Sequence, residues 1–231
     1  MGKRILLVDD EPLILKGLKY TLEQEGYETE SAMDGEEALD KFFEQPYDLI
    51  LLDVMLPKLD GLSVCQRIRE HSTVPIIMLT AKGDDMDKIL GLEYGADDYM
   101  TKPFNILEVK ARIKTILRRV NQPHTPAEEP RIVRVRDLEV NFLKRTVTLA
   151  GEEIRLTAKE FDLLAMFVSN RGRPFTRKEM LENVWKYDYT GDARTVDVHI
   201  RRLREKIERD TTKPEFICTK WKVGYYFTDK N

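Results

Sequence analysis

The chain has 231 residues, of which 42% are hydrophobic and 34% charged, and its formal net charge is −3. These proportions are typical of a folded globular protein and leave room for two domains. No apolar run approaches the ~20 residues of a membrane-spanning helix, and the first such run meets acids too early for a signal peptide. We therefore expect a cytoplasmic protein with no membrane partner. Cys65 and Cys218 lack metal-ligand spacing and are expected to be buried, reduced thiols.

Residues 1–120 alternate short apolar runs with amphipathic stretches. Five strand and helix pairs follow one another, with the strands predicted at RILLVD, ETESA, LILLD, PIIMLT and DDYMT. Runs such as ILLV and LILL are apolar on both faces, as are strands of a parallel sheet that helices cover. Pro12 suits a first helical turn, while Gly26 and Gly95 suit helix ends. The pattern predicts an α/β domain with a doubly wound, five-stranded parallel sheet.

Polar residues stand at the carboxyl ends of these strands, namely Asp9, Asp10, Asp53, Thr80 and Lys102. In a doubly wound sheet, ligands bind at this edge, where the strand order reverses. If the first and third strands are neighbours, the three carboxylates converge. Three like charges raise one another's pKa unless a cation lies among them, and their hard oxygen atoms suit Mg²⁺. The sequence therefore implies a divalent metal site.

Each of these residues also has a purely structural interpretation. An Asp that follows a strand is usually a helix N-cap or a turn residue, and this holds for Asp53 or Asp10 taken alone. A lone Lys102 is more often a solvated surface lysine, and a lone Thr80 is most often part of a turn. The combination favours a site, because three acids, a hydroxyl and an ammonium all stand at the carboxyl ends of strands of the same predicted sheet.

Residues 121–130, NQPHTPAEEP, have the composition of a linker, with three prolines and otherwise polar or small residues. Residues 1–120 hold 16 Lys and Arg against 23 Asp and Glu, a net charge of −7. Residues 121–231 hold 22 against 18, a net charge of +4. An acidic half is thus joined to a basic half, which indicates that the second half meets a polyanion.

Residues 131–231 have a different pattern, which predicts an α+β domain. The alternating runs RIVRVRDLEVNF, RTVTLAG and EEIRLT predict a small antiparallel sheet, and helices are predicted at AKEFDLLAMFVSN and TRKEMLENVW. A third helix, in DARTVDVHIRRLREKIERD, places on one face Val196, Ile200, Leu203 and Ile207. Its arginines fall elsewhere. FICTKWKVGYYF predicts two strands around a turn at Lys222 to Gly224.

The first half resembles a known family. VDDE, LLDVMLPKLDG, MLTA and GADDYMTKPF, with the spacing among them, resemble the receiver domain of two-component response regulators over essentially all of residues 1–120. The resemblance implies a flavodoxin-like receiver that accepts a phosphoryl group from a sensor histidine kinase. It implies the following roles: Asp53 as the phosphorylated residue; Asp9, Asp10, Asp53 and the Met55 carbonyl as Mg²⁺ ligands; Thr80 and Tyr99 as switch residues; and Lys102, before a cis-proline at Pro103, as the phosphate-binding lysine.

A dimer is also implied. In the OmpR/PhoB-type subfamily, charged residues on the last strand and its flanking helices form ion pairs between two copies. At the matching positions the resemblance implies three intermolecular pairs: Lys88 with Glu108, Asp98 with Arg112, and Asp97 with Arg119. From the residues alone, an ordinary solvated face is the simpler interpretation, because exposed charges are common and exposed pairs are weak.

The second half resembles the winged helix-turn-helix domain of the same subfamily over residues 131–229, most clearly in ARTVDVHIRRLREK. From charge alone, an arginine-bearing helix is usually just solvated. The resemblance implies contacts with double-stranded promoter DNA: bases for Arg201 and Arg202, and the phosphate backbone for Arg194, His199, Trp185, Thr219 and Tyr225. In the wing, Trp221 is followed by Lys222 where the family usually has glycine, and Lys222 would add a phosphate contact. The loop 186–192 is where this subfamily touches RNA polymerase.

The expected function is a phosphorylation-activated transcriptional regulator that dimerises through its receiver and is not an enzyme in the usual sense. An aspartyl-phosphate phosphatase is a competing hypothesis, but such hydrolases typically need a second acid two residues after the nucleophile, where this chain has Met55. Another alternative is a DNA-binding regulator whose receiver only dimerises and never uses phosphate. The complete set of site residues argues against that alternative, namely Asp9, Asp10, Asp53, Thr80 and Lys102.

Overall fold

The computed structural model of the chain describes residues 2–81, 94–120, 132–185 and 194–229, without the side chains of residues 118–120 and 194. The chain divides into two compact units, Met1–Val120 and Asn121–Asn231. The linker predicted at residues 121–130 lies outside the described residues, and so does the helix predicted between the fourth and fifth strands. Among the described helices, none combines the length and the apolar character that a membrane crossing needs.

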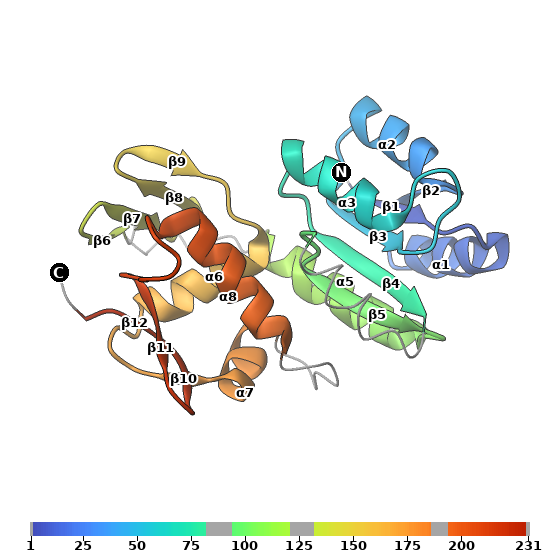
Figure 1. Cartoon of the computed structure of the whole chain (residues 1–231). Helices are drawn as coiled ribbons and strands as arrows, with labels where there is room; N and C mark the ends of the chain where they lie inside the picture. Colours follow the sequence, from blue (N-terminus) through green and yellow to red (C-terminus); the bar gives the residue numbers. More distant parts are fainter. Residues whose placement is uncertain (1, 82–93, 121–131, 186–193, 230–231) are drawn as a thin grey trace. The chain divides into compact units, whose positions relative to one another are not determined.

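The N-terminal unit contains the predicted five-stranded parallel sheet (Figure 1). Its strands are β1 (Arg4–Val8), β2 (Glu28–Ala32), β3 (Leu49–Asp53), β4 (Ile76–Ala81) and β5 (Asp98–Lys102). The order across the sheet is β2-β1-β3-β4-β5, with every neighbouring pair parallel. The first and third strands are therefore neighbours, and the doubly wound prediction is confirmed.

The helices of this unit begin at residues whose chemistry suits a helix start. They are α1 (Pro12–Gln24), α2 (Gly35–Glu44), α3 (Gly61–His71) and α5 (Ile106–Val120). Pro12 occupies the first turn of α1, and the side chains of Asp34 and Asp60 cap α2 and α3 by accepting backbone N–H groups. Apolar residues of α1 and α5 share one core cluster with alternate residues of the sheet. Helices α2 and α3 pack against each other.

The loop after β3 is tightly packed, which fixes the carboxyl end of that strand. The N–H of Gly61 donates to the carbonyl of Val54 at 2.9 Å. A Cβ at Gly61 would lie 1.9 Å from the carbonyl oxygen of Asp53, so only glycine allows this approach. Lys58 has a φ of 63° and pairs with Asp34 at 2.6 Å, which ties the loop to α2.

The C-terminal unit begins with the predicted antiparallel sheet. Its strands are β6 (Ile132–Val135), β7 (Leu138–Asn141), β8 (Thr146–Leu149) and β9 (Glu152–Ile154), in that order. The helices that follow are α6 (Ala158–Val168), α7 (Arg177–Met180), the π-helical turn η1 (Leu181–Trp185) and α8 (Arg194–Ile207). Thr157 and Thr176 each form a capping box with the glutamate three residues later, and so start α6 and α7.

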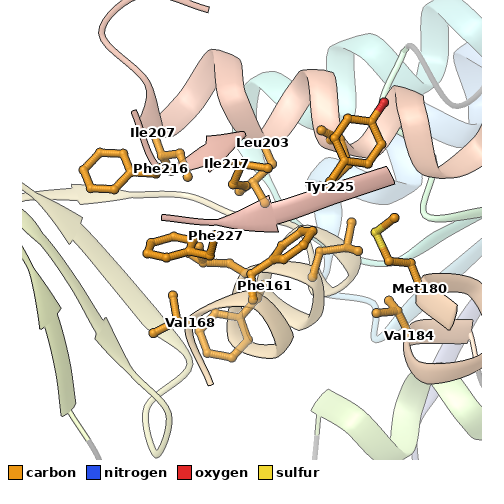
Figure 2. Packing of buried hydrophobic residues seen from close by; sticks show 14 of the residues in the cluster. Phe161, Val168, Met180, Val184, Leu203, Ile207, Phe216, Ile217, Tyr225 and Phe227 are labelled. Carbon is orange, nitrogen blue, oxygen red and sulfur yellow. The ribbon is translucent and has the colours of Figure 1, made fainter. Parts of the chain in front are cut away.

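A second, three-stranded sheet closes this unit, in the order β10 (Phe175–Thr176), β12 (Gly224–Phe227), β11 (Ile217–Lys220). The sequence predicted β11 and β12 but not the two-residue β10. A Cβ at Gly224 would lie 2.0 Å from the carbonyl oxygen of Phe175, so glycine lets β10 approach. Figure 2 shows the core between these strands and the helices, where Leu203 of α8 lies by Ile217 of β11. The order of sheet, helices and strand pair is the predicted winged helix-turn-helix.

We predict that Gly61→Ala lowers the free energy of unfolding by about 1–3 kcal/mol, because the added methyl group must displace the backbone of Asp53. Urea unfolding of the full chain measures this. Gly17→Ala is the matched control, since a Cβ there meets no atom of another part of the described chain within 4 Å. It should instead raise the free energy of unfolding by about 0.5–1 kcal/mol, because alanine favours the helix interior. Equal effects of the two changes would contradict the packing argument.

Candidate functional site

Three carboxylates meet at the carboxyl end of the N-terminal sheet. Asp9 and Asp10 directly follow β1, and Asp53 ends β3. Each offers one oxygen, and these oxygens lie within 4.8 Å of one another. Asp9 and Asp53 are buried and Asp10 is exposed. The structure thus brings together the three acids that the sequence placed at this edge.

Lys102 lies among these acids. Its Nζ atom is 2.8 Å from Oδ2 of Asp9 and 2.7 Å from Oδ2 of Asp53. Glu11, which the sequence analysis missed as a site residue, is 3.4 Å from the same Nζ. The Lys102–Pro103 peptide bond is cis, as the resemblance implied. Asp53 ends β3 and Lys102 ends β5, so the carboxylate and the ammonium come from the two strands on either side of β4.

Burial and charge act against each other in this cluster. Burial raises the pKa of the Asp53 carboxyl above its ordinary value, although the Lys102 ammonium acts in the opposite direction. Burial alone would lower the pKa of Lys102, but its bonds with Asp53 and Asp9 raise it above the ordinary value. Lys102 is therefore an ammonium at neutral pH, and it neutralises one of the two buried negative charges.

The remaining charge makes the site suitable for a divalent cation. One ammonium leaves one buried carboxylate charge uncompensated, and the exposed Asp10 adds another. Carboxylate oxygens are the hard ligands that Mg²⁺ takes. The backbone N–H of Met55 donates to Oδ1 of Asp53 at 3.3 Å, and the Met55 side chain is exposed. Asp9, Asp10 and Asp53 therefore fit a bound Mg²⁺.

The two predicted switch residues lie on β4 and β5. Thr80 is fully buried, and its hydroxyl donates to the Met100 carbonyl on the neighbouring strand at 3.4 Å. Tyr99 is 6% exposed, so its ring is already inside the unit. Thr80 is the last buried residue of β4, the strand next to β3, which ends in Asp53.

The structure places several of the predicted dimer residues in ion pairs within one chain, and the pairs between two copies stay predictions. Asp97 is fully buried and accepts from Arg69 at 2.8 Å, so it does not present a charge to a second copy. Asp98 and Arg112 do pair, at 2.8 Å, but within one chain, and Arg112 also pairs with Glu108. The buried carboxylates of Asp97 and Asp98 need a positive charge nearby, and arginines of the same chain supply it. Lys88 and the Arg119 side chain lie outside what the structure describes.

On α8, the two arginines predicted to reach bases differ. The Arg201 side chain is 56% exposed and pairs with Glu205 at 3.3 Å. The Arg202 side chain is only 12% exposed and lies 3.7 Å from Oε1 of the fully buried Glu160. Burial alone would raise the pKa of Glu160, but the charges of Lys206 and Arg202 hold it below its ordinary value. In this structure the Arg202 guanidinium therefore lies against a buried acid of its own unit, and its contact with a base stays a prediction.

Two residues predicted to contact phosphates belong to the core. His199 is fully buried, its Nδ1 lies 2.9 Å from the Thr195 carbonyl, and its ring packs edge-on against Trp185 at 5.2 Å. Trp185 is fully buried as well. In this structure neither side chain can touch a DNA backbone, because no part of either is exposed.

Tyr225 has an internal role, and its contact with phosphate stays a prediction. It is 8% exposed, and its hydroxyl donates to Oδ1 of Asp197 on α8 at 2.8 Å. Burial and this carboxylate raise the pKa of the Tyr225 hydroxyl. Arg177 donates to the same oxygen at 2.8 Å, and the guanidinium groups of Arg177 and Arg204 each lie 5.4 Å from the centre of the Tyr225 ring. Sequence reasoning had no signal for this long-range network.

The wing keeps exposed candidates for DNA contact. Trp221 is 80% exposed, and Thr219 and Lys222 are exposed too. The Val223 N–H donates to the Lys220 carbonyl at 3.0 Å, which closes a tight turn. Lys222 is the third residue of this turn and has a φ of 59°. It thus adopts the left-handed conformation that glycine usually supplies, and the turn forms despite the missing glycine. The Arg194 side chain and the loop 186–192 lie outside the described residues.

Comparisons with known proteins agree with this architecture. A family model described as "Response regulator receiver domain" matches residues 5–114, and one described as "Transcriptional regulatory protein, C terminal" matches residues 151–227. The response regulator DrrB of Thermotoga maritima, an OmpR/PhoB homologue, is 36% identical over 99% of this chain and 100% of its own, with a TM-score of 0.53.

Two further solved structures are similar. A RitR mutant is 31% identical and covers 100% of both chains, with a TM-score of 0.75. A two-component response regulator from Clostridium difficile is 38% identical and covers 52% of this chain and 99% of its own, with a TM-score of 0.51. The similarity to DrrB and to the RitR mutant therefore extends over both units of the chain, whereas the Clostridium difficile structure covers about half of it.

We predict that saturating Mg²⁺ stabilises the chain, by about 2.7 kcal/mol at a hundredfold excess over the dissociation constant. Thermal unfolding with and without Mg²⁺ measures this. Asp10→Asn should leave the unfolding temperature without metal unchanged, because Asp10 is exposed, but should reduce the shift that Mg²⁺ causes. Equal shifts in both proteins would mean that Asp10 is not a ligand.

For the wing we predict that Lys222→Gly raises the free energy of unfolding by about 1 kcal/mol, because a residue with a side chain is strained at positive φ. Lys222→Ala removes the same charge but keeps the strain, so it should bring no gain. Chemical unfolding of both variants measures the difference. A gain of the same size from alanine would attribute the effect to charge instead of backbone conformation.

Proposed function

The chain belongs to the two-component response regulators of the OmpR/PhoB type, and we propose that it is a transcriptional regulator activated by phosphorylation of Asp53 by a sensor histidine kinase. The observation that carries this proposal is the position of Lys102 between two buried carboxylates. An acid that merely capped a helix would need neither this ammonium nor a second acid within bonding distance of it. DNA is the partner of the basic C-terminal unit, and the cytoplasm, where promoter DNA lies, is the proposed location.

The proposed reaction uses the Asp53 carboxylate as nucleophile. One carboxylate oxygen attacks the phosphorus of a phosphohistidine, a P–O bond forms, and the P–N bond breaks to release the imidazole. Lys102, already 2.7 Å from this carboxylate, neutralises charge on the transferring oxygens. A bound Mg²⁺, held by Asp9, Asp10, Asp53 and the Met55 carbonyl, would supply further charge neutralisation.

The new phosphoryl group would then alter the residues around it. Thr80 would exchange its hydrogen bond with the Met100 carbonyl for one with a phosphoryl oxygen. This displacement would favour the buried position of Tyr99, which the ring occupies here. A local change of charge would thereby bias a two-state surface on β4 and β5.

Dimerisation is proposed through the face of β5 and α5. Asp98 and Arg112 pair within one chain, and Glu108, although it also pairs with Arg112, is 43% exposed, so a second copy's Lys88 could reach it. Arg119 remains proposed as a further contact. A dimer raises the local concentration of the two DNA-binding units on a repeated site, which increases affinity without new contacts.

DNA binding is proposed through α8 and the wing. Arg201 would contact guanine in the major groove, with Arg194, Thr219, Trp221 and Lys222 on the backbone and the neighbouring groove. The loop 186–192 is proposed to contact RNA polymerase. In this proposal the chain turns over no external substrate. The alternative, a phosphate-independent regulator whose receiver only dimerises, would leave the Lys102 cluster without a use.

The test is intact mass and solution size after incubation with acetyl phosphate and Mg²⁺. Wild type should gain the mass of one phosphoryl group and shift from monomer to dimer, whereas Asp53→Asn should do neither, because it lacks the nucleophilic oxygen. Asp40→Asn, a change of an exposed aspartate on α2, is the matched control and should behave like wild type. An unmodified wild type that still binds DNA would favour the phosphate-independent alternative.

A further inference from the structure

Helix α8 presents a narrow exposed stripe of mixed charge. The residues turned into the unit are Thr195, Val196, Val198, His199, Ile200, Leu203 and Ile207. Asp197, Arg201 and Glu205 follow one another at intervals of four residues, so they form one stripe along the helix. Their side chains are 36%, 56% and 52% exposed. The face offered to a ligand thus contains two acids.

Acids on a DNA-facing helix need an explanation, because phosphate groups repel them. Each of the two is paired with an arginine. Asp197 accepts from Arg177 at 2.8 Å, and Glu205 lies 3.3 Å from Nε of Arg201. The first pair also holds Tyr225 and so has a structural role. The second pair joins two exposed side chains on one helix, and such pairs contribute little to stability. It lies on the stripe where DNA contact is proposed, so its effect on DNA binding can be tested apart from folding.

The other described arginines of α8 are engaged with the unit itself. Arg202 lies against the buried Glu160, and Arg204 donates to the Ile217 carbonyl and to Thr219. Arg201 is thus the one guanidinium, among the side chains described on this helix, that stands in the middle of the exposed stripe. Whatever fixes the direction of Arg201 controls what this helix reads.

We propose that Glu205 is a specificity-determining residue that orients Arg201 for guanine and disfavours its use on phosphates. The inference rests on the proposed DNA binding. Glu205 lies 3.3 Å from Nε, the inner nitrogen of the guanidinium, and so restricts rotation of the guanidinium plane, which a bidentate contact with O6 and N7 of guanine needs to be fixed. The negative charge of Glu205 also disfavours a position of Arg201 against the phosphate backbone, because the carboxylate would then lie close to the phosphates. Glu205 thus lowers the affinity for DNA in general and raises the discrimination between bases.

The experiment selects binding sites for the full chain from a library of random duplexes. Affinity is then measured for the selected site, for sites with single guanine substitutions, and for unrelated duplex, at two salt concentrations. In Glu205→Gln we expect discrimination at one guanine to fall about tenfold, and binding to unrelated duplex to tighten, since a bidentate contact is lost while a repulsion is removed. The unfolding temperature should not change.

Two variants make the result specific. Glu139→Gln removes the same charge from a pair with Arg134 on the first sheet of this unit, and it should keep wild-type discrimination. Arg201→Lys removes the planar guanidinium and should lose discrimination at the same guanine as Glu205→Gln. Loss at one shared position in these two variants, and not in Glu139→Gln, supports the proposal.

The opposing outcomes are distinct. If wild type selects a site and Glu205→Gln discriminates equally well, or if Arg201→Lys keeps its guanine preference, the role of Glu205 is overturned while DNA binding stands. If wild type selects no sequence at all, the proposed function fails in its sequence-reading step, and the inference fails with it.

Discussion

The ammonium of Lys102, held between the buried carboxylates of Asp9 and Asp53, is the interaction on which the N-terminal unit depends. Two buried like charges a few ångströms apart are costly in a medium of low polarity, and each needs a compensating charge. Strand order supplies it, because parallel strands bring their carboxyl ends to one edge. The same arrangement that makes the cluster tolerable leaves a net negative charge for a metal, so folding and chemistry share one electrostatic requirement.

Neutralisation of buried charge also shapes the C-terminal unit. Glu160 forms a capping box at the start of α6 and is fully buried, so it draws Lys206 and Arg202 of α8 toward the core. Glu208 likewise accepts the backbone N–H groups of residues 215–217. Arg202, which the sequence assigned to DNA, is thereby paired inside the unit. Which cation faces outward is decided by the buried acids.

This explains where sequence reasoning succeeded and where it failed. The cluster of Asp9, Asp53 and Lys102 was predictable, since each residue ends a strand whose apolar run is plain. On α8, periodicity found the apolar face of Val196 and Leu203 and placed both Arg201 and Arg202 outside it. It could not tell which of the two pairs with a buried acid, because that acid, Glu160, is on α6. His199 lies on this same face, three residues after Val196 and four before Leu203, so the periodicity could have predicted its burial. Burial of Tyr225 depends on contacts that no local pattern records.

The packing of the C-terminal unit further indicates how a signal can act on DNA binding. Tyr225 of β12 is bonded to Asp197 of α8, and Arg204 of α8 donates to the Ile217 carbonyl and to Thr219 of β11. Gly224 lets β10 lie against the same sheet. Recognition helix and wing are therefore joined by several bonds at once, and moving one without the other would break them together. In the proposed dimer, control would therefore act through the local concentration and spacing of two DNA-binding units, with no change in the shape of either.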